Sequence, residues 1–258
     1  MSQTWTTPNC SYSKLFYGAL TAPHLLIAGA TGSGKSVIIN QLITTVLKTR
    51  FPLDNERGAQ LILIDPKRVE LVQYKPAPHT LIYASEPNEI IQTLERAMAT
   101  TESRYKQMQK NQERKYTGGD IYIIIDEYAD LVTTNKKQVQ PIIQRIAQIG
   151  RAAKLHIILA TQCPISKILT TEIKCNFDYR FGLHTRSAQD SRNILGVNGC
   201  EELPQYGQSY YMTPQGLTLY NIPMIEDSEI EKLVKHWTDQ ANTNSNHFFS
   251  GLCAFFGF

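Results

Sequence analysis

The sequence predicts an α/β fold with a central, mostly parallel sheet that is covered by helices on both faces. Short apolar segments of strand length alternate with longer segments whose apolar residues recur at helical spacing. The segment 121–125 is continuously apolar, as expected of a central strand that is buried on both faces. A glycine-rich loop joins the first apolar segment to the first long helix. A chain of 258 residues can hold one large unit of this kind.

The elements of this unit can be placed in order along the chain. Residues 1–24 are mixed and polar with scattered aromatic residues, and we expect them to run over the surface before the first strand. The expected strands are 25–28, 61–64, 81–83, 121–125, 156–160 and 177–184, followed by a hairpin over 210–220. The expected helices run from Gly34 to near Arg50, from Pro87 toward Tyr116, over 139–153 and over 227–237. Pro52 should end the first of these helices, and Gly118 and Gly119 the second. The predicted division is a surface segment (1–24), a main domain (25–226) and a C-terminal helix with an apolar tail (227–258).

Composition and charge exclude several classes of protein. With 42% apolar and 19% charged residues, the chain should fold as a globular protein, and a net charge of +3 does not by itself argue for a nucleic-acid partner. The five cysteines form no C-x-x-C pair, so a disulfide framework or zinc site is not expected and a cytoplasmic location fits. We expect no signal peptide and no transmembrane segment. The apolar tail over 247–258 should pack on the domain or on a neighbouring subunit.

A phosphate-binding loop is the most specific feature of the sequence. Residues 29–36 fit the pattern G-x-x-x-x-G-K-[ST], and they follow an apolar strand and open a helix. Backbone N–H groups in such a loop make a concave anion site, Lys35 should reach the β- and γ-phosphates, and Ser36 should bind Mg²⁺. The alternative, a chance match in a turn, is disfavoured by the strand-loop-helix context. The predicted ATP-binding residues are Gly29, Ala30, Thr31, Gly32, Ser33, Gly34, Lys35 and Ser36.

Two acidic residues follow the buried strand 121–125. Asp126 is predicted to complete the Mg²⁺ site, because a phosphate loop needs a carboxylate at the end of a buried strand as its partner. Glu127 is predicted to orient the water that attacks the γ-phosphate. The alternative for Glu127 is an acid at a helix N-terminus that the helix dipole favours. The acidic pair after an apolar run favours an ATP hydrolase.

Two further residues are candidates for catalysis, each with a structural alternative. Gln162 follows the strand 156–160 and could contact both the γ-phosphate and the water, although polar residues at strand tips are common in turns. Arg151 could stabilise transition-state charge on a neighbouring subunit's nucleotide, although a basic residue near a helix end is most often simply solvated. Spacing alone does not decide between these readings.

Together, these segments resemble the motor domain of the FtsK/SpoIIIE family of DNA translocases. The resemblance covers about 180 residues and rests on PHLLIAGATGSGKS (23–36), LILIDPKRVEL (61–71), IIIDEYADL (123–131), RAAKLHIILATQCP (151–164) and DSRNILGVNGCEELP (190–204). It implies a RecA-like P-loop core over 25–226 that assembles into a homohexameric ring and moves duplex DNA using ATP and Mg²⁺. It also implies that Gln162 senses the γ-phosphate, that Arg151 acts across subunits, and that Asp65 and Lys67 surround the site.

The chain departs from the family pattern in three places. Family members commonly carry a basic residue just before the DSR triplet that reaches the adjacent subunit's phosphates, whereas Ala188 and Gln189 stand there in this chain. Only Arg186 is near, and whether it replaces that residue is left open. Cys163 stands where the family usually has arginine. We also expect neither the family's membrane region nor its winged-helix domain. This would fit a motor that is carried by a mobile element, plasmid or phage, and such a motor would need another protein to recruit it.

The predicted function is therefore ATP-driven translocation of double-stranded DNA, with a sequence-independent grip on the phosphate backbone. Lysines on predicted loops are candidate DNA contacts, with a solvated surface as the alternative: Lys136, Lys137, Lys167 and Lys174. One alternative function is a coupling ATPase for conjugative transfer or secretion, with a protein or relaxase–DNA cargo. Another is an ATP-dependent switch or scaffold in which hydrolysis is incidental.

Overall fold

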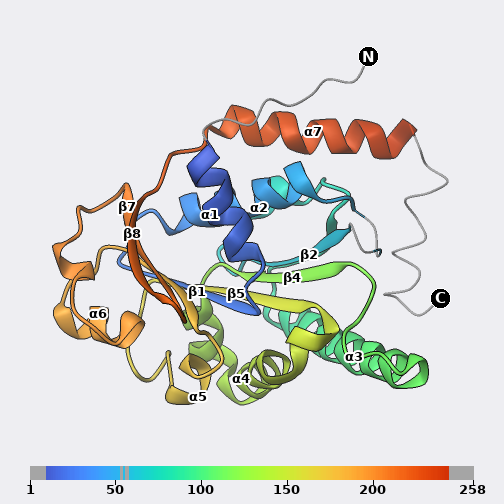
Figure 1. Ribbon diagram of the computed structural model, residues 1–258, viewed down its shortest axis with the longest axis horizontal. Helices are drawn as coiled ribbons and strands as arrows, with labels where there is room; N and C mark the ends of the chain where they lie inside the picture. The colour runs from blue at the N-terminus through green and yellow to red at the C-terminus, as the bar shows by residue number, and fades with distance from the viewer. Residues whose placement is uncertain (1–9, 53–54, 56–57, 244–258) are drawn as a thin grey trace.

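The computed structural model describes residues 10–52, 55 and 58–243, and it has the predicted α/β architecture (Figure 1). Its helices and longer strands are α1 (Cys10–Leu20), β1 (His24–Ala28), α2 (Lys35–Thr49), β2 (Ala59–Ile64), β3 (Thr80–Ala84), α3 (Pro87–Asn111), β4 (Asp120–Ile125), α4 (Tyr128–Ala153), β5 (Leu155–Thr161), α5 (Thr171–Lys174), β6 (Tyr179–Gly182), α6 (Ala188–Leu195), β7 (Gln208–Thr213), β8 (Gly216–Asn221) and α7 (Asp227–Thr243). None of the described helices combines the length and hydropathy needed to cross a membrane.

The eight strands of the described residues form one sheet in the order β3-β2-β4-β5-β1-β6-β7-β8. The six strands from β3 to β6 run parallel, and the hairpin of β7 and β8 adds two antiparallel strands at one edge. Strand β5 lies between β1 and β4, so that the segments after these three strands emerge side by side at one edge of the sheet.

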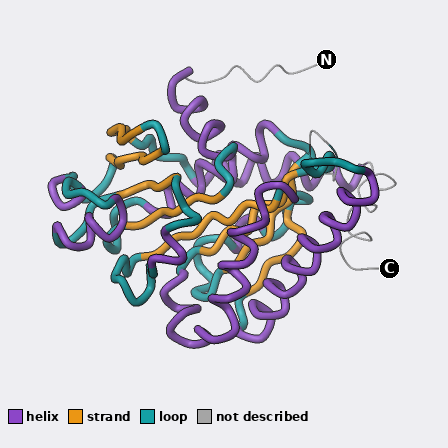
Figure 2. The backbone as a smooth tube through the Cα atoms, turned by 60° about the horizontal axis from the view of Figure 1, so that its bottom comes forward, coloured by secondary structure: helices purple, strands orange, loops and turns teal. Residues whose placement is uncertain are grey.

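Two hydrophobic cores lie on opposite faces of the sheet, since successive residues of a strand point to opposite sides. Leu26 and Ile123 face the core that α3 and α4 cover, whereas Leu25 and Ile124 face the core that α1, α2 and α7 cover. Figure 1 shows the two layers above and below the sheet, and Figure 2 shows the central strands between helices. The continuously apolar strands of the sequence are therefore buried on both faces, as predicted.

The segment 1–24, which was expected to run over the surface, contains helix α1 (Cys10–Leu20), an element that the sequence did not predict. The buried residues of α1 share one face of the helix: Leu15, Phe16, Ala19 and Leu20. Phe16 stacks on Phe181 of β6 with ring centroids 6.2 Å apart. Packing on the sheet thus stabilises a helix whose local sequence is polar and aromatic.

Three predicted helix boundaries also differ. Helix α3 ends at Asn111, where Gln112 takes a left-handed conformation (φ 56°), well before Gly118. Helix α4 begins at Tyr128, not near 139, and passes through a kink at Asn135 (φ −134°, ψ 35°). Helix α7 continues to Thr243, beyond the predicted end at 237. The apolar tail over 247–258 lies outside the described residues.

We expect the folded protein to be less stable in acid, because two of its histidines are buried. Burial lowers the pKa of His24 to about 3 and that of His79 to about 4 from the ordinary value of 6.5. Both are neutral in the folded protein, so the unfolded chain binds more protons below pH 6.5 and stability falls as the pH falls. At pH 5 each histidine should reduce the free energy of unfolding by about 2 kcal/mol relative to pH 8.

Urea unfolding at pH 8 and pH 5 measures this loss of stability. The variant His79→Phe should show a smaller difference between the two pH values than the wild type does. Equal unfolding free energies for the wild type at pH 8 and pH 5 would contradict the burial of these side chains in neutral form.

Candidate nucleotide site

The glycines of residues 29–34 are required by the backbone of the loop. Gly34 precedes α2 with φ 96° and Gly32 has φ 75°, conformations that L-residues rarely adopt. A Cβ atom on Gly29 would lie 2.8 Å from the Cβ of Leu183 and 3.1 Å from the carbonyl oxygen of His184. The loop therefore turns tightly between β1 and α2 and packs directly against the end of β6.

Lys35 lies inside this turn. Its Nζ donates hydrogen bonds to the carbonyl oxygens of Gly29 (3.0 Å) and Ala30 (2.8 Å), and the residue is 6% exposed. Burial lowers the pKa of Lys35 to about 8, and the negative charges of Glu127 and Asp126 oppose this shift. The ammonium group is thus within electrostatic reach of both predicted acidic residues. Ser36 follows in the first turn of α2, half-buried.

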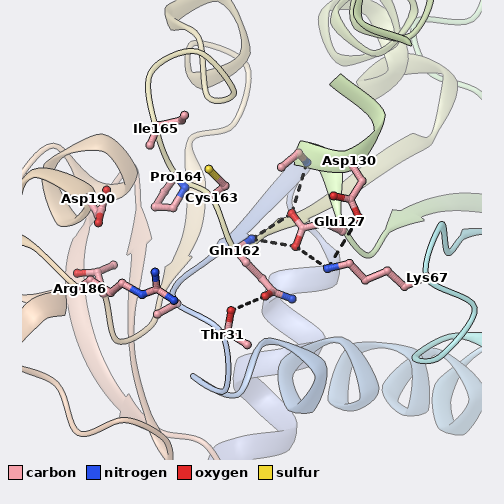
Figure 3. Close-up of a pocket in the computed structure, with 13 residues that line it drawn as sticks. Thr31, Lys67, Glu127, Asp130, Gln162, Cys163, Pro164, Ile165, Arg186 and Asp190 are labelled. Carbon is pink, nitrogen blue, oxygen red and sulfur yellow. Dashed lines mark hydrogen bonds and ion pairs between the residues drawn. The ribbon is translucent and has the colours of Figure 1, made fainter. Parts of the chain in front are cut away.

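The predicted site residues from β4 and β5 meet the phosphate loop at one edge of the sheet. Asp126 and Glu127 directly follow β4, and Gln162 directly follows β5. The side chain of Gln162 reaches the loop, because its Oε1 accepts a hydrogen bond from Thr31 Oγ1 at 2.7 Å. Glu127, Gln162 and Thr31 line one cavity (Figure 3).

Glu127 is 2% exposed and its carboxylate is held by several donors. Oε1 accepts hydrogen bonds from Thr161 Oγ1 (2.9 Å) and from the backbone N–H of Gln162 (3.1 Å). Lys67 Nζ lies 3.5 Å from Oε2 and 3.8 Å from Asp130 Oδ2 (Figure 3). Glu127 also caps α4, because its carboxylate accepts a hydrogen bond from the backbone N–H of Ala129. The residue is therefore a helix cap, as the alternative expected, and its carboxylate still lines the cavity.

The surroundings of Asp126 suit a cation. Burial and the charges of Glu70, Asp65 and Glu127 raise the pKa of Asp126 to about 7. Asp65 is fully buried, and its Oδ1 has no hydrogen-bond partner. A divalent cation would neutralise this excess of carboxylates, and Mg²⁺ typically takes one or two carboxylates together with phosphate oxygens and waters. Ser36 and Asp126 are the residues that would hold it, and bound Mg²⁺ would supply charge neutralisation for the phosphates.

The described residues contain no cluster of three His, Cys, Asp or Glu side chains arranged to hold a metal. Sequence reasoning did not assign roles to Thr161, Glu70 or Asp130. A role for Thr161 in the site could have been predicted, because it immediately precedes Gln162 at the same strand end.

The two arginines lie at different places relative to this site. Arg151 is exposed in the last turn of α4, which leads into the start of β5, at the edge of the sheet opposite the phosphate loop. Seven strand residues separate these edges by about 20 Å. Arg151 therefore does not join the other predicted residues within one chain, and its action on a neighbouring subunit stays a prediction.

Arg186 does belong to the cavity in the same chain. The cavity has a volume of about 400 Å³. It is lined by Ala30, Thr31, Lys67, Glu127, Ala129, Asp130, Gln162, Cys163, Pro164, Ile165, Thr185, Arg186 and Asp190. Its walls come from the phosphate loop, the ends of β4 and β5, and the segment after β6.

A parallel α/β sheet with a glycine-rich loop before a helix, and with an acidic pair two strands away, defines a P-loop ATPase. The profile of the FtsK/SpoIIIE family matches residues 9–123 and 119–166. The chain is also 37% identical over 244 residues to a DNA translocase FtsK of Staphylococcus epidermidis, a match that covers 86% of this chain and 30% of that protein. The chain belongs to the FtsK/SpoIIIE family and is a P-loop ATPase that binds ATP.

Solved structures share the fold of this chain. The pCW3 conjugation coupling protein TcpA, in its monomer form with ATPγS, matches with a TM-score of 0.73 at 20% identity, over 84% of this chain and 66% of that chain. The cytoplasmic domain of the type VII secretion ATPase EccC of Thermomonospora curvata matches with a TM-score of 0.69 at 21% identity, over 84% of this chain and 28% of that chain. The curated FtsK relatives are much longer, since this chain spans about 30% of their length.

Proposed function

We propose that this ATPase converts hydrolysis of Mg-ATP into movement of double-stranded DNA. The observation that carries this proposal is the continuity between the nucleotide cavity and a basic surface. Gln162 touches the phosphate loop, and the chain after it contributes Cys163, Pro164 and Ile165 to the same cavity before it reaches Lys167. When the γ-phosphate is lost, Gln162 would change its contacts. The segment 163–167, which contains a candidate DNA contact, would then move with it.

The basic surface combines two elements that are distant in sequence. Lys136 and Lys137 are exposed on α4, and Lys167 is exposed before α5. Gln140 of α4 donates a hydrogen bond to Thr170 Oγ1 at 3.4 Å, which joins α4 to the segment 163–170. Hydrogen bonds from its own backbone and from Thr170, together with the charge of Lys136, lower the pKa of Glu172 in α5. Lysines on this surface would bind phosphates, independently of sequence.

The proposal that the protein acts as an oligomer rests on the position of Arg151. An arginine that stabilises transition-state charge must reach a nucleotide, and Arg151 lies at the far edge of the sheet from its own phosphate loop. A closed ring of identical subunits would bring Arg151 of one chain to the site of the next. We propose a homohexamer by analogy with the family, acting with a recruiting protein in a mobile-element, plasmid or phage context.

The ATPase rate with and without long duplex DNA, over a series of salt concentrations, tests this proposal. We expect strong stimulation by long duplex that weakens steeply with salt, and no turnover by the control variant Lys35→Ala. Stimulation by a protein partner but not by DNA would replace the proposal with a coupling ATPase. Turnover that responds to neither would indicate a switch or scaffold.

Charge reversal on the basic surface should separate DNA binding from hydrolysis. The double variant Lys136→Glu/Lys167→Glu is expected to lower DNA affinity at least tenfold and to shift half-maximal stimulation to higher DNA concentration. Its turnover without DNA should equal that of the wild type. The matched control is Lys232→Glu/Lys235→Glu on α7, which makes the same change in charge at two exposed lysines on the opposite face of the sheet. Equal loss of DNA affinity in the control would contradict the assignment of this surface.

A further inference from the structure

We propose that Arg186 binds the γ-phosphate of the nucleotide held by its own chain. This inference rests on the proposed ATP site. It assigns Arg186 to the site in cis, whereas the family resemblance implies a basic residue that reaches across subunits. The assignment is supported by the contacts around the end of β6, by the lining of the cavity and by the donors of the guanidinium group.

The end of β6 is attached to the phosphate loop by backbone hydrogen bonds. The N–H of Leu183 donates to the carbonyl oxygen of Ala28 at 2.9 Å, and the N–H of Ala30 donates to the carbonyl oxygen of His184 at 2.8 Å. The close approach of Gly29 to Leu183 and His184 leaves no room for a side chain between the two segments. The segment that carries Arg186 is therefore held against its own phosphate loop.

The residues on both sides of Arg186 are also fixed. Thr185 is 1% exposed, and its N–H donates to the carbonyl oxygen of Cys200 at 3.2 Å. Ser187 caps α6, because its Oγ accepts from the N–H of Asp190 (3.2 Å) and donates to Asp190 Oδ2 (2.9 Å). The backbone of Arg186 is thus positioned by its neighbours, and only its side chain needs to move to reach a ligand.

The side chain of Arg186 faces the place where the terminal phosphate is expected. In Figure 3 the guanidinium group extends toward Thr31 and Gln162, the two residues that are hydrogen-bonded across the cavity. Among the described residues (10–52, 55 and 58–243), no carboxylate forms an ion pair with Arg186. Its five N–H donors can bind phosphate oxygens in a fork, which an ammonium group cannot do.

Nucleotide binding by dilute, monomeric protein tests the proposal, with sedimentation confirming the monomer. The variant Arg186→Ala should bind ATPγS at least tenfold more weakly than the wild type and ADP within about twofold, because ADP lacks the γ-phosphate. Arg186→Lys should recover part of the ATPγS affinity, and the control Arg151→Ala should bind both nucleotides normally. Equal losses for ATPγS and ADP, or an unchanged ATPγS affinity of Arg186→Ala, would overturn the proposal. Failure of the wild type to bind either nucleotide would instead refute the ATP site itself.

A mixing experiment separates action in cis from action in trans within the assembled protein. Lys35→Ala chains are inactive at their own site but retain both arginines. Mixed with Arg186→Ala chains, they should restore no turnover, because no single chain then carries both Lys35 and Arg186. Restored turnover would show that Arg186 acts on a neighbour and would contradict the proposal.

Discussion

Replacing Glu127 with glutamine is expected to reduce ATP turnover by about 10²- to 10⁴-fold, the usual contribution of a positioned acid–base group. Glutamine has nearly the shape of glutamate, and its amide oxygen can still accept from Thr161 Oγ1 and from the N–H of Gln162. The cap of α4 and the fold should therefore persist, while the group that accepts a proton from water is lost. Steady-state phosphate release measures the turnover, and ATPγS affinity should stay within about threefold of wild type.

The matched control for this substitution is Glu95→Gln, since Glu95 is an exposed residue of α3 far from the cavity. It should retain wild-type turnover. If Glu127→Gln also hydrolysed ATP at the wild-type rate, Glu127 would have no part in the mechanism, and its contacts with Thr161 and Lys67 would be purely structural.

Replacing Arg151 with alanine is expected to lower turnover by about 10³- to 10⁵-fold, the range observed for arginine fingers. The residue is exposed and lies at the edge of the sheet opposite the phosphate loop, so the effect requires a second chain. The loss should therefore appear only in the assembled protein, and nucleotide binding by monomers should be unchanged.

Mixing variants tests whether Arg151 acts between chains. In mixtures of Arg151→Ala with Glu127→Gln, some interfaces combine an intact Glu127 with an intact Arg151 from the neighbour. Random assembly at equal amounts gives about one quarter of such interfaces, and turnover should rise accordingly. Absence of any recovery, at every ratio at which mixed rings are shown to form, would contradict action across subunits.

The features that the sequence predicts well are those that local chemistry determines. The glycines at 32 and 34 are required by positive φ angles within the loop itself, and the apolar run 121–125 must be buried wherever it lies. The hairpin predicted over 210–220 corresponds to β7 and β8. Because strand ends of a parallel sheet meet at one edge, Glu127 and Gln162 could be placed together before the sheet order was known.

The features that the sequence does not reveal depend on contacts between distant segments. Helix α1 is stabilised by packing such as Phe16 on Phe181, which its own composition does not suggest. The place of Arg186 depends on the pairing of β6 with β1, which no local pattern determines. In this pairing Arg180 lies opposite Leu26, 154 residues earlier in the chain. The family resemblance implies that Lys67 lies near the site, but its ion pair with Glu127 depends on the pairing of β2 with β4.

Displacement of a third strand from a duplex–triplex DNA substrate tests the central claim most directly, because it detects movement along DNA as well as ATP turnover. We expect the wild-type protein to displace the third strand in the presence of Mg-ATP, and to do so more slowly as salt increases. ATPγS should not support displacement, and Glu127→Gln should bind the DNA without displacing the strand. Rapid DNA-stimulated hydrolysis by the wild type with no displacement of the third strand would contradict the account.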